Sequence, residues 1–168
     1  GGQQLVAHNR AGASGKVGGE LAAKAAPDGY TLFMTSGSVV TANQHMFRKL
    51  NWNPDKDLVA ITNVASGPQI VAVHPSVPAR NIKDLIALAK AQPGAITFGS
   101  AGIGTQTHLA AENFVFTAGI SATHVPYKGE APAMVDLVAG QIVFVTPNLS
   151  AAIGYVQQGR LAGLGVTS

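Results

Sequence analysis

Two glycine-rich turns carry backbone groups that could bind an anion. Residues 12–18 and residues 100–105 each lie between an expected strand and an expected helix. Such a turn places unpaired N–H groups at the positive end of a helix, which suits a carboxylate or a phosphate. Neither turn matches a nucleotide motif, because Val17 stands where a phosphate-binding loop needs Ser or Thr, and Thr107 stands at the third glycine position of a dinucleotide fingerprint. We therefore expect no nucleotide: each turn either binds a small anion or is simply a tight turn made by its glycines.

Histidine and serine side chains allow two further kinds of chemistry. His108 and Glu112 lie four residues apart on one expected helix, but a zinc site needs at least one more ligand. Ser100, His108 or His124, and Asp136 could be written as a triad, yet no Gly-x-Ser-x-Gly elbow surrounds any serine. We expect no catalytic residue and no metal, and we expect His108 to fix the glycine-rich turn through hydrogen bonds. A serine-dependent α/β hydrolase-like enzyme is kept as the alternative.

A second group of site candidates follows the strand expected near residues 122–125. Pro126-Tyr127-Lys128-Gly129 ends that strand, and the next helix has a proline in its first turn. In a parallel sheet this order brings Tyr127 and Lys128 to the edge at which residues 100–105 also lie. We expect the Tyr127 hydroxyl to face the same crevice. The alternative is a Tyr127 packed in the core beside a solvated Lys128.

Composition and charge exclude several classes of protein. The chain has no cysteine, which removes disulfides, thiolate catalysis and cysteine-ligated metal sites. Its 11 basic and 8 acidic residues are scattered, so we expect no nucleic-acid partner. We also expect no cofactor. The longest uncharged stretch, residues 137–159, is interrupted by Gly, Pro, Asn and Gln, and is better explained by a strand, a turn and a helix than by a membrane span.

The elements that position these residues form two blocks, divided near residues 73–78. In the first block we expect strands at 4–8, 30–35, 58–64 and 69–73, helices at 16–26 and 39–47, and a loop at 48–57. In the second block Asn81 is the expected cap of a helix that begins at Ile82 and stops at Pro93-Gly94. Beyond it, strands at 96–99, 122–125, 141–145 and 161–166 alternate with helices at 105–117, 131–139 and 149–158. This alternation predicts an α/β fold with largely parallel sheets.

The chain also carries six short motifs in a fixed order. They are Asn9-Arg10-Ala11-Gly12-Ala13, Pro27-Asp28-Gly29-Tyr30-Thr31-Leu32, Ser100-x-Gly-x-Gly104 with His108-Leu109-Ala110, Val125-Pro126-Tyr127-Lys128-Gly129 with Pro132-Ala133, Gly140-Gln141, and Val166-Thr167-Ser168. In this combination the whole chain resembles the Bug-type receptors, the extracytoplasmic solute-binding proteins of tripartite tricarboxylate transporters.

The resemblance implies a fold, a function and a partner. The fold is α/β and periplasmic-binding-protein type II-like, with two lobes that have mainly parallel sheets. Family members begin before the first motif and continue past the last, so residues 1–74 are expected to be an incomplete first lobe. Residues 75–165 are the expected second lobe, and residues 166–168 start the return crossover, beside residues 73–78. The implied protein is a periplasmic receptor, monomeric when complete, that presents a small organic carboxylate to membrane permease subunits and catalyses nothing.

The resemblance also places the ligand contacts residue by residue. In the first lobe they fall on the turn that contains Ser36 and Ser38. In the second lobe they fall on the two segments already singled out, namely Ser100, Ala101, Gly102, Gly104, Thr105, His108, Tyr127, Lys128 and Gly129. Residues 10–18 are expected to be structural.

Overall fold

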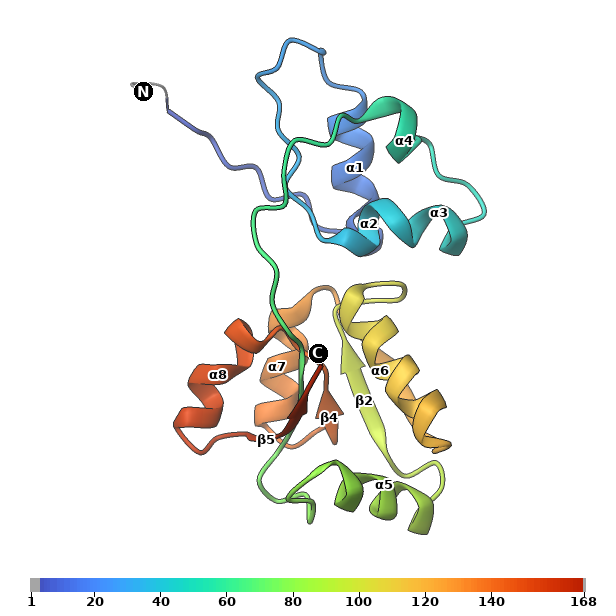
Figure 1. Cartoon of the computed structure of the whole chain (residues 1–168), viewed down its shortest axis with the longest axis vertical. Helices are drawn as coiled ribbons and strands as arrows, with labels where there is room; N and C mark the ends of the chain where they lie inside the picture. The colour runs from blue at the N-terminus through green and yellow to red at the C-terminus, as the bar shows by residue number, and fades with distance from the viewer. Residues whose placement is uncertain (1–3, 168) are drawn as a thin grey trace. The chain divides into compact units, whose positions relative to one another are not determined.

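The computed structural model describes residues 4–167, which form two compact units with a boundary between Ala60 and Ile61 (Figure 1). The first unit is helical and the second contains a five-stranded sheet. Within the described part of the chain, no helix is long and apolar enough to cross a lipid bilayer.

The first unit packs short helices around one tryptophan. Its elements are the 3-10 turn η1 (Ala13–Gly15) and the helices α1 (Lys16–Ala23), α2 (Gly37–Thr41), α3 (Asn43–Met46) and α4 (Pro54–Asp57). Trp52 is buried, and the Phe33 ring lies nearly perpendicular to it at a centroid distance of 6.5 Å. Helix α4 lies in the stretch expected to be a loop; the Asn53 side chain caps it by accepting a hydrogen bond from Asp55 N, 2.9 Å away.

The three strands expected at residues 4–8, 30–35 and 58–64 do not form among the described residues, so that prediction is wrong there. These segments are largely exposed, including large apolar side chains such as Leu5, Tyr30, Met34 and Val59. A β-prone segment becomes a strand only when a neighbouring strand supplies hydrogen-bond partners. No such partner lies beside them within residues 4–167.

Gly19 offers a sharp test of packing in the first unit. A Cβ atom added to Gly19 would clash with Trp52 Cζ2, so the buried indole must move. We expect Gly19→Ala to lower the free energy of unfolding by about 1–3 kcal/mol through overpacking. Gly154→Ala in helix α8 (Leu149–Gln157) is the matched control, because its added methyl group meets open space and should be neutral or slightly stabilising. Thermal unfolding of both variants checks this, and equal midpoints would contradict it.

The second unit contains a mixed sheet with the strand order β3-β2-β4-β1-β5. The strands are β1 (Ile70–Val73), β2 (Thr97–Ser100), β3 (Thr123–Pro126), β4 (Phe144–Val145) and β5 (Ala162–Val166). Strand β2 pairs in parallel with β3 and β4, whereas β1 runs antiparallel to both β4 and β5. The α/β fold expected from the sequence is confirmed, and β1 is the strand that makes its sheet mixed.

Helices cover both faces of this sheet. Neighbouring residues of a strand point to opposite faces, so one strand can contribute side chains to both cores. Phe144 and Val145 show this within β4, since both are fully buried but belong to different cores. Phe144 packs in the core with helices α5 (Ile82–Ala91) and α6 (Gln106–Ala118), and Val145 packs in the core with α7 (Glu130–Val138) and α8 (Figure 1). The Asn81 side chain accepts a hydrogen bond from Asp84 N at 3.0 Å, which confirms the expected cap of α5.

Residues 69–70 and residues 166–167 of the second unit lie side by side. Ile70 pairs with Val166, and Thr167 N donates to Gln69 O at 2.8 Å. The expectation that residues 73–78 lie beside the segment that begins at Val166 is wrong, because Val73 pairs with Ala162, at the opposite end of β5. Pro75 follows β1 in a turn. Ser168, included in that expectation, lies outside the described residues, as do residues 1–3. The lobe boundaries at residues 74/75 and 165/166 stay predictions.

Candidate functional site

The two segments expected to bind ligand in the second unit lie side by side. Strands β2 and β3 are parallel neighbours, so the turns that follow them leave the same edge of the sheet. Tyr127 N donates to Ser100 O at 3.0 Å, and Gly129 N donates to Ala101 O at 3.2 Å. These two backbone bonds join the turn at residues 100–105 to the segment at residues 127–129.

The turn at residues 100–105 is held by its own polar groups. Gly102 N donates to the buried Ser100 Oγ at 3.1 Å, and Thr105 Oγ1 donates to Gly102 O at 2.6 Å. Gly102 and Gly104 have φ angles of 128° and 79°, which favour glycine. Thr105 is the N-cap of α6, and its Oγ1 accepts from His108 N at 3.4 Å. The hydroxyl groups of Ser100 and Thr105 therefore hold the shape of the turn.

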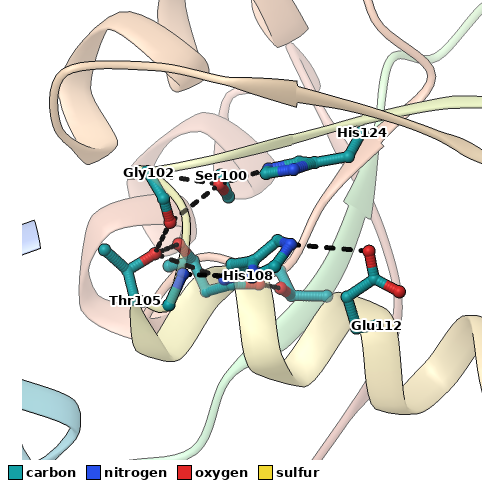
Figure 2. Close-up of polar contacts among 9 residues, drawn as sticks. Ser100, Gly102, Thr105, His108, Glu112 and His124 are labelled. Carbon is teal, nitrogen blue, oxygen red and sulfur yellow. Dashed lines mark hydrogen bonds and ion pairs between the residues drawn. The ribbon is translucent and has the colours of Figure 1, made fainter. Parts of the chain in front are cut away.

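His108 fixes this turn from the first part of α6, as expected from the sequence. Its Nδ1 accepts a hydrogen bond from Gly104 N at 3.2 Å (Figure 2). Its Nε2 lies 3.4 Å from Glu112 Oε1. An accepting Nδ1 carries no proton, so this geometry assigns the proton of the neutral ring to Nε2, the nitrogen that lies beside the Glu112 carboxylate.

His124 closes the cluster from β3. Its Nε2 lies 2.6 Å from Ser100 Oγ, and its ring centroid lies 4.1 Å from that of His108 (Figure 2). Phe98 stacks on the His124 ring with a centroid distance of 4.8 Å. Burial, and then the proximity of His108, lower the pKa of His124 below its ordinary value. The His124 ring is therefore neutral at pH 7 and serves as a hydrogen-bonding partner of Ser100.

The triad considered from the sequence is only partly assembled. Ser100 and His124 are in hydrogen-bond contact, but Ser100 is fully buried. Asp136 Oδ2 accepts a hydrogen bond from the Tyr127 hydroxyl at 2.7 Å. The carboxylate expected to orient the histidine is thus engaged with a tyrosine. Among residues 4–167, no group of three or more His, Cys, Asp or Glu side chains could hold a metal ion.

Tyr127 is half-buried and is hydrogen-bonded within the second unit. The Tyr127 ring packs against the core beneath α7, and its hydroxyl donates to Asp136 on that helix. Burial, and then this hydrogen bond, raise the pKa of Tyr127 to about 12. Lys128 is exposed. The Tyr127 hydroxyl thus has a partner within the unit, and that Tyr127 and Lys128 contact a ligand stays a prediction.

In the first unit, Ser36 and Ser38 lie at the start of α2. Their Oγ atoms are 3.2 Å apart; Ser36 is exposed and Ser38 is buried. That they contact a ligand stays a prediction.

Two threonines support the site without having been singled out as binding residues in the sequence. Thr107 is buried, and its Oγ1 accepts from Ala101 N at 2.9 Å and lies 3.1 Å from Thr105 Oγ1. The buried Thr146 follows β4, and its Oγ1 donates to Thr107 O at 2.6 Å. Thr107 stands out in the sequence only as a failed dinucleotide position, and nothing local predicts its contact with Thr146.

The turn at residues 12–18 is tied to its own unit through Lys16. Lys16 Nζ donates to Lys49 O at 2.7 Å and lies 5.4 Å from the centre of the Phe47 ring. We expect Lys16→Ala to leave carboxylate affinity within a few-fold, because the lysine is engaged locally and exposed contacts of this kind contribute little. Calorimetric titration of a receptor of full family length that includes this chain would check this. A hundredfold loss of affinity would assign the turn to the binding site instead.

The second unit has the architecture of a type II periplasmic binding protein domain, with an anion-compatible turn at one edge of its sheet. Comparison with known proteins agrees. Residues 1–168 match the family described as "TctC: Tripartite tricarboxylate transporter family receptor", and the chain belongs to that family.

Individual relatives support the assignment over the same span. The protein BugT of Bordetella pertussis is 34% identical over 168 residues, covering 99% of this chain and 52% of BugT. A solved structure described as a periplasmic transporter is 37% identical, with a TM-score of 0.95, and the match covers 99% of this chain and 56% of that one. The structure of R. palustris Rpa4515 with adipate is 32% identical, with a TM-score of 0.96 and the same coverage. This chain thus spans about half the length of the relatives it matches.

Proposed function

We propose that the chain serves in an extracytoplasmic solute-binding receptor that captures a small organic carboxylate. The observation that carries the proposal is the glycine turn at residues 100–105, which leads directly into the 13-residue helix α6. Membership of the receptor family supports the class of protein. The adipate in the R. palustris relative supports a carboxylate as the class of ligand.

The N-terminus of α6 suits an anion for two physical reasons. The first N–H groups of a helix have no intrahelical carbonyl partner, and in α6 this turn begins at the exposed Gln106. The first turn contains no acidic side chain that would compete for these donors or repel an anion. A carboxylate bound there gains hydrogen bonds of about 1.5–3 kcal/mol each when the acceptor is charged. Recognition then depends on the backbone and needs no salt bridge.

The wider role follows from the family and is also part of the proposal. The receptor works in the periplasm, as the solved relative described as a periplasmic transporter suggests. It delivers its carboxylate to the membrane permease subunits of a tripartite tricarboxylate-type transporter, and the family's description supports this partner.

The test is calorimetric titration of adipate into a receptor of full family length that includes this chain. Shorter dicarboxylates, tricarboxylates, acidic amino acids and aromatic acids complete the panel. We expect saturable binding of at least one carboxylate and a rise in unfolding temperature with ligand concentration. An ester substrate is included because Ser100 contacts His124. Serine-dependent hydrolysis, or no stabilisation by any carboxylate, would overturn the proposal.

A further inference from the structure

His108 contacts the glycine turn through one specific hydrogen bond. In this hydrogen bond the N–H group of Gly104, in the turn, donates to Nδ1 of His108, on α6. Gly104 is buried and has a φ of 79°. A buried N–H group left without an acceptor is costly. Removal of the His108 acceptor should therefore cause the turn to change shape.

The surroundings of His108 hold the ring in the orientation that makes this bond. Its side chain is only 12% exposed. The Phe98 ring lies nearly parallel to it at a centroid distance of 6.4 Å. The His124 ring lies 4.1 Å away between centroids. Glu112 lies beside Nε2 and so favours the tautomer in which Nδ1 is free to accept. The packing of the His108 ring and its tautomer together point the lone pair of Nδ1 at Gly104 N.

We propose that His108 is a positioning residue of the carboxylate site, which acts by holding the Gly104 N–H group so that the first-turn N–H groups of α6 meet the ligand. This inference rests on the proposed function, because it assigns a role within the same site. In this role His108 does not contact the ligand directly. It holds the shape of the turn, and the ligand binds the backbone N–H groups.

Two substitutions separate the hydrogen bond from the packing. In His108→Asn the amide oxygen can occupy the place of Nδ1 and accept from Gly104 N, whereas His108→Leu fills the space but accepts nothing. For adipate titrated into the receptor, we expect His108→Leu to weaken binding by about tenfold to a hundredfold. His108→Asn should recover most of that loss, because its amide oxygen can still accept from Gly104 N. Equal losses in the two variants, or wild-type affinity in His108→Leu, would overturn the proposal.

A second measurement needs no ligand and keeps the two hypotheses apart. Hydrogen exchange of the Gly104 amide, followed by NMR, should be slow in the wild type and in His108→Asn, and faster in His108→Leu. Rapid exchange in the wild type would show that His108 does not hold Gly104, even if adipate binds. A protected Gly104 amide in a receptor that binds no carboxylate would overturn the proposed function, and the ligand part of this inference with it, while leaving the hydrogen bond established.

Discussion

Gly104→Asp is expected to weaken carboxylate binding by about a hundredfold or more, because it places a fixed negative charge where the ligand's own charge is held. Gly104 lies in the turn that leads into α6, in a left-handed backbone conformation with a φ of 79°. An Asp side chain at this position can accept hydrogen bonds from the first-turn N–H groups of α6 that the ligand would otherwise use. It also repels an incoming anion in a site partly shielded from water.

Gly104→Asn is the matched control for this substitution. Asn and Asp have nearly the same shape and both tolerate the left-handed region better than other side chains, so the backbone strain and the added volume are shared. The difference in affinity between the two variants therefore measures the charge alone. Calorimetric titration gives both affinities, and circular dichroism establishes that both variants fold. Equal affinities in the folded Asp and Asn variants would place the anion elsewhere.

The helices of the second unit could be predicted because their signals are local. Asn81 and Thr105 cap α5 and α6 with their own side chains, and Pro93-Gly94 follows the end of α5. Caps and stops act over three or four residues, so one sequence contains them in full. The hydrogen bond between His108 and the glycine turn could also be predicted, because His108 lies only four residues from Gly104.

Strand pairing in the first unit and strand direction in the second could not be predicted in the same way. Residues 30–35 have the composition of a strand, but composition does not supply a neighbour. Strand β1 has the apolar pattern of a buried strand, and that pattern is the same whether its neighbours run parallel or antiparallel. Both features depend on residues far away in the chain.

The distant contacts of the site were hidden for a related reason. The partner of the Tyr127 hydroxyl depends on the side-chain rotamer, which turns it to Asp136 on α7. The hydrogen bond from Thr146 to Thr107 joins residues 39 positions apart. A turn that could bind an anion can be recognised in the sequence. The contacts that support this turn, such as that of Thr146 with Thr107, can be recognised only in the fold.

Phe98→Ala is expected to lower the free energy of unfolding of the second unit by about 3–5 kcal/mol, the usual range for deleting a buried phenylalanine ring. Phe98 is fully buried on β2. Its ring stacks on His124 and lies 5.4 Å from Phe144 between centroids. The substitution therefore leaves a cavity in the core and removes a wall of the histidine cluster, so we expect ligand affinity to fall as well.

Phe116→Ala is the control of identical chemistry. Phe116 lies on α6 and is 87% exposed, so its loss should change the free energy of unfolding by less than about 0.5 kcal/mol. Urea unfolding followed by circular dichroism compares the two variants, with the slope of the transition as a check that the unfolded state is unchanged. If both variants lost the same stability, the core around Phe98 would not be what holds this unit together. If Phe98→Ala lost stability but kept its affinity for adipate, the histidine cluster would hold the turn without support from the ring beneath it.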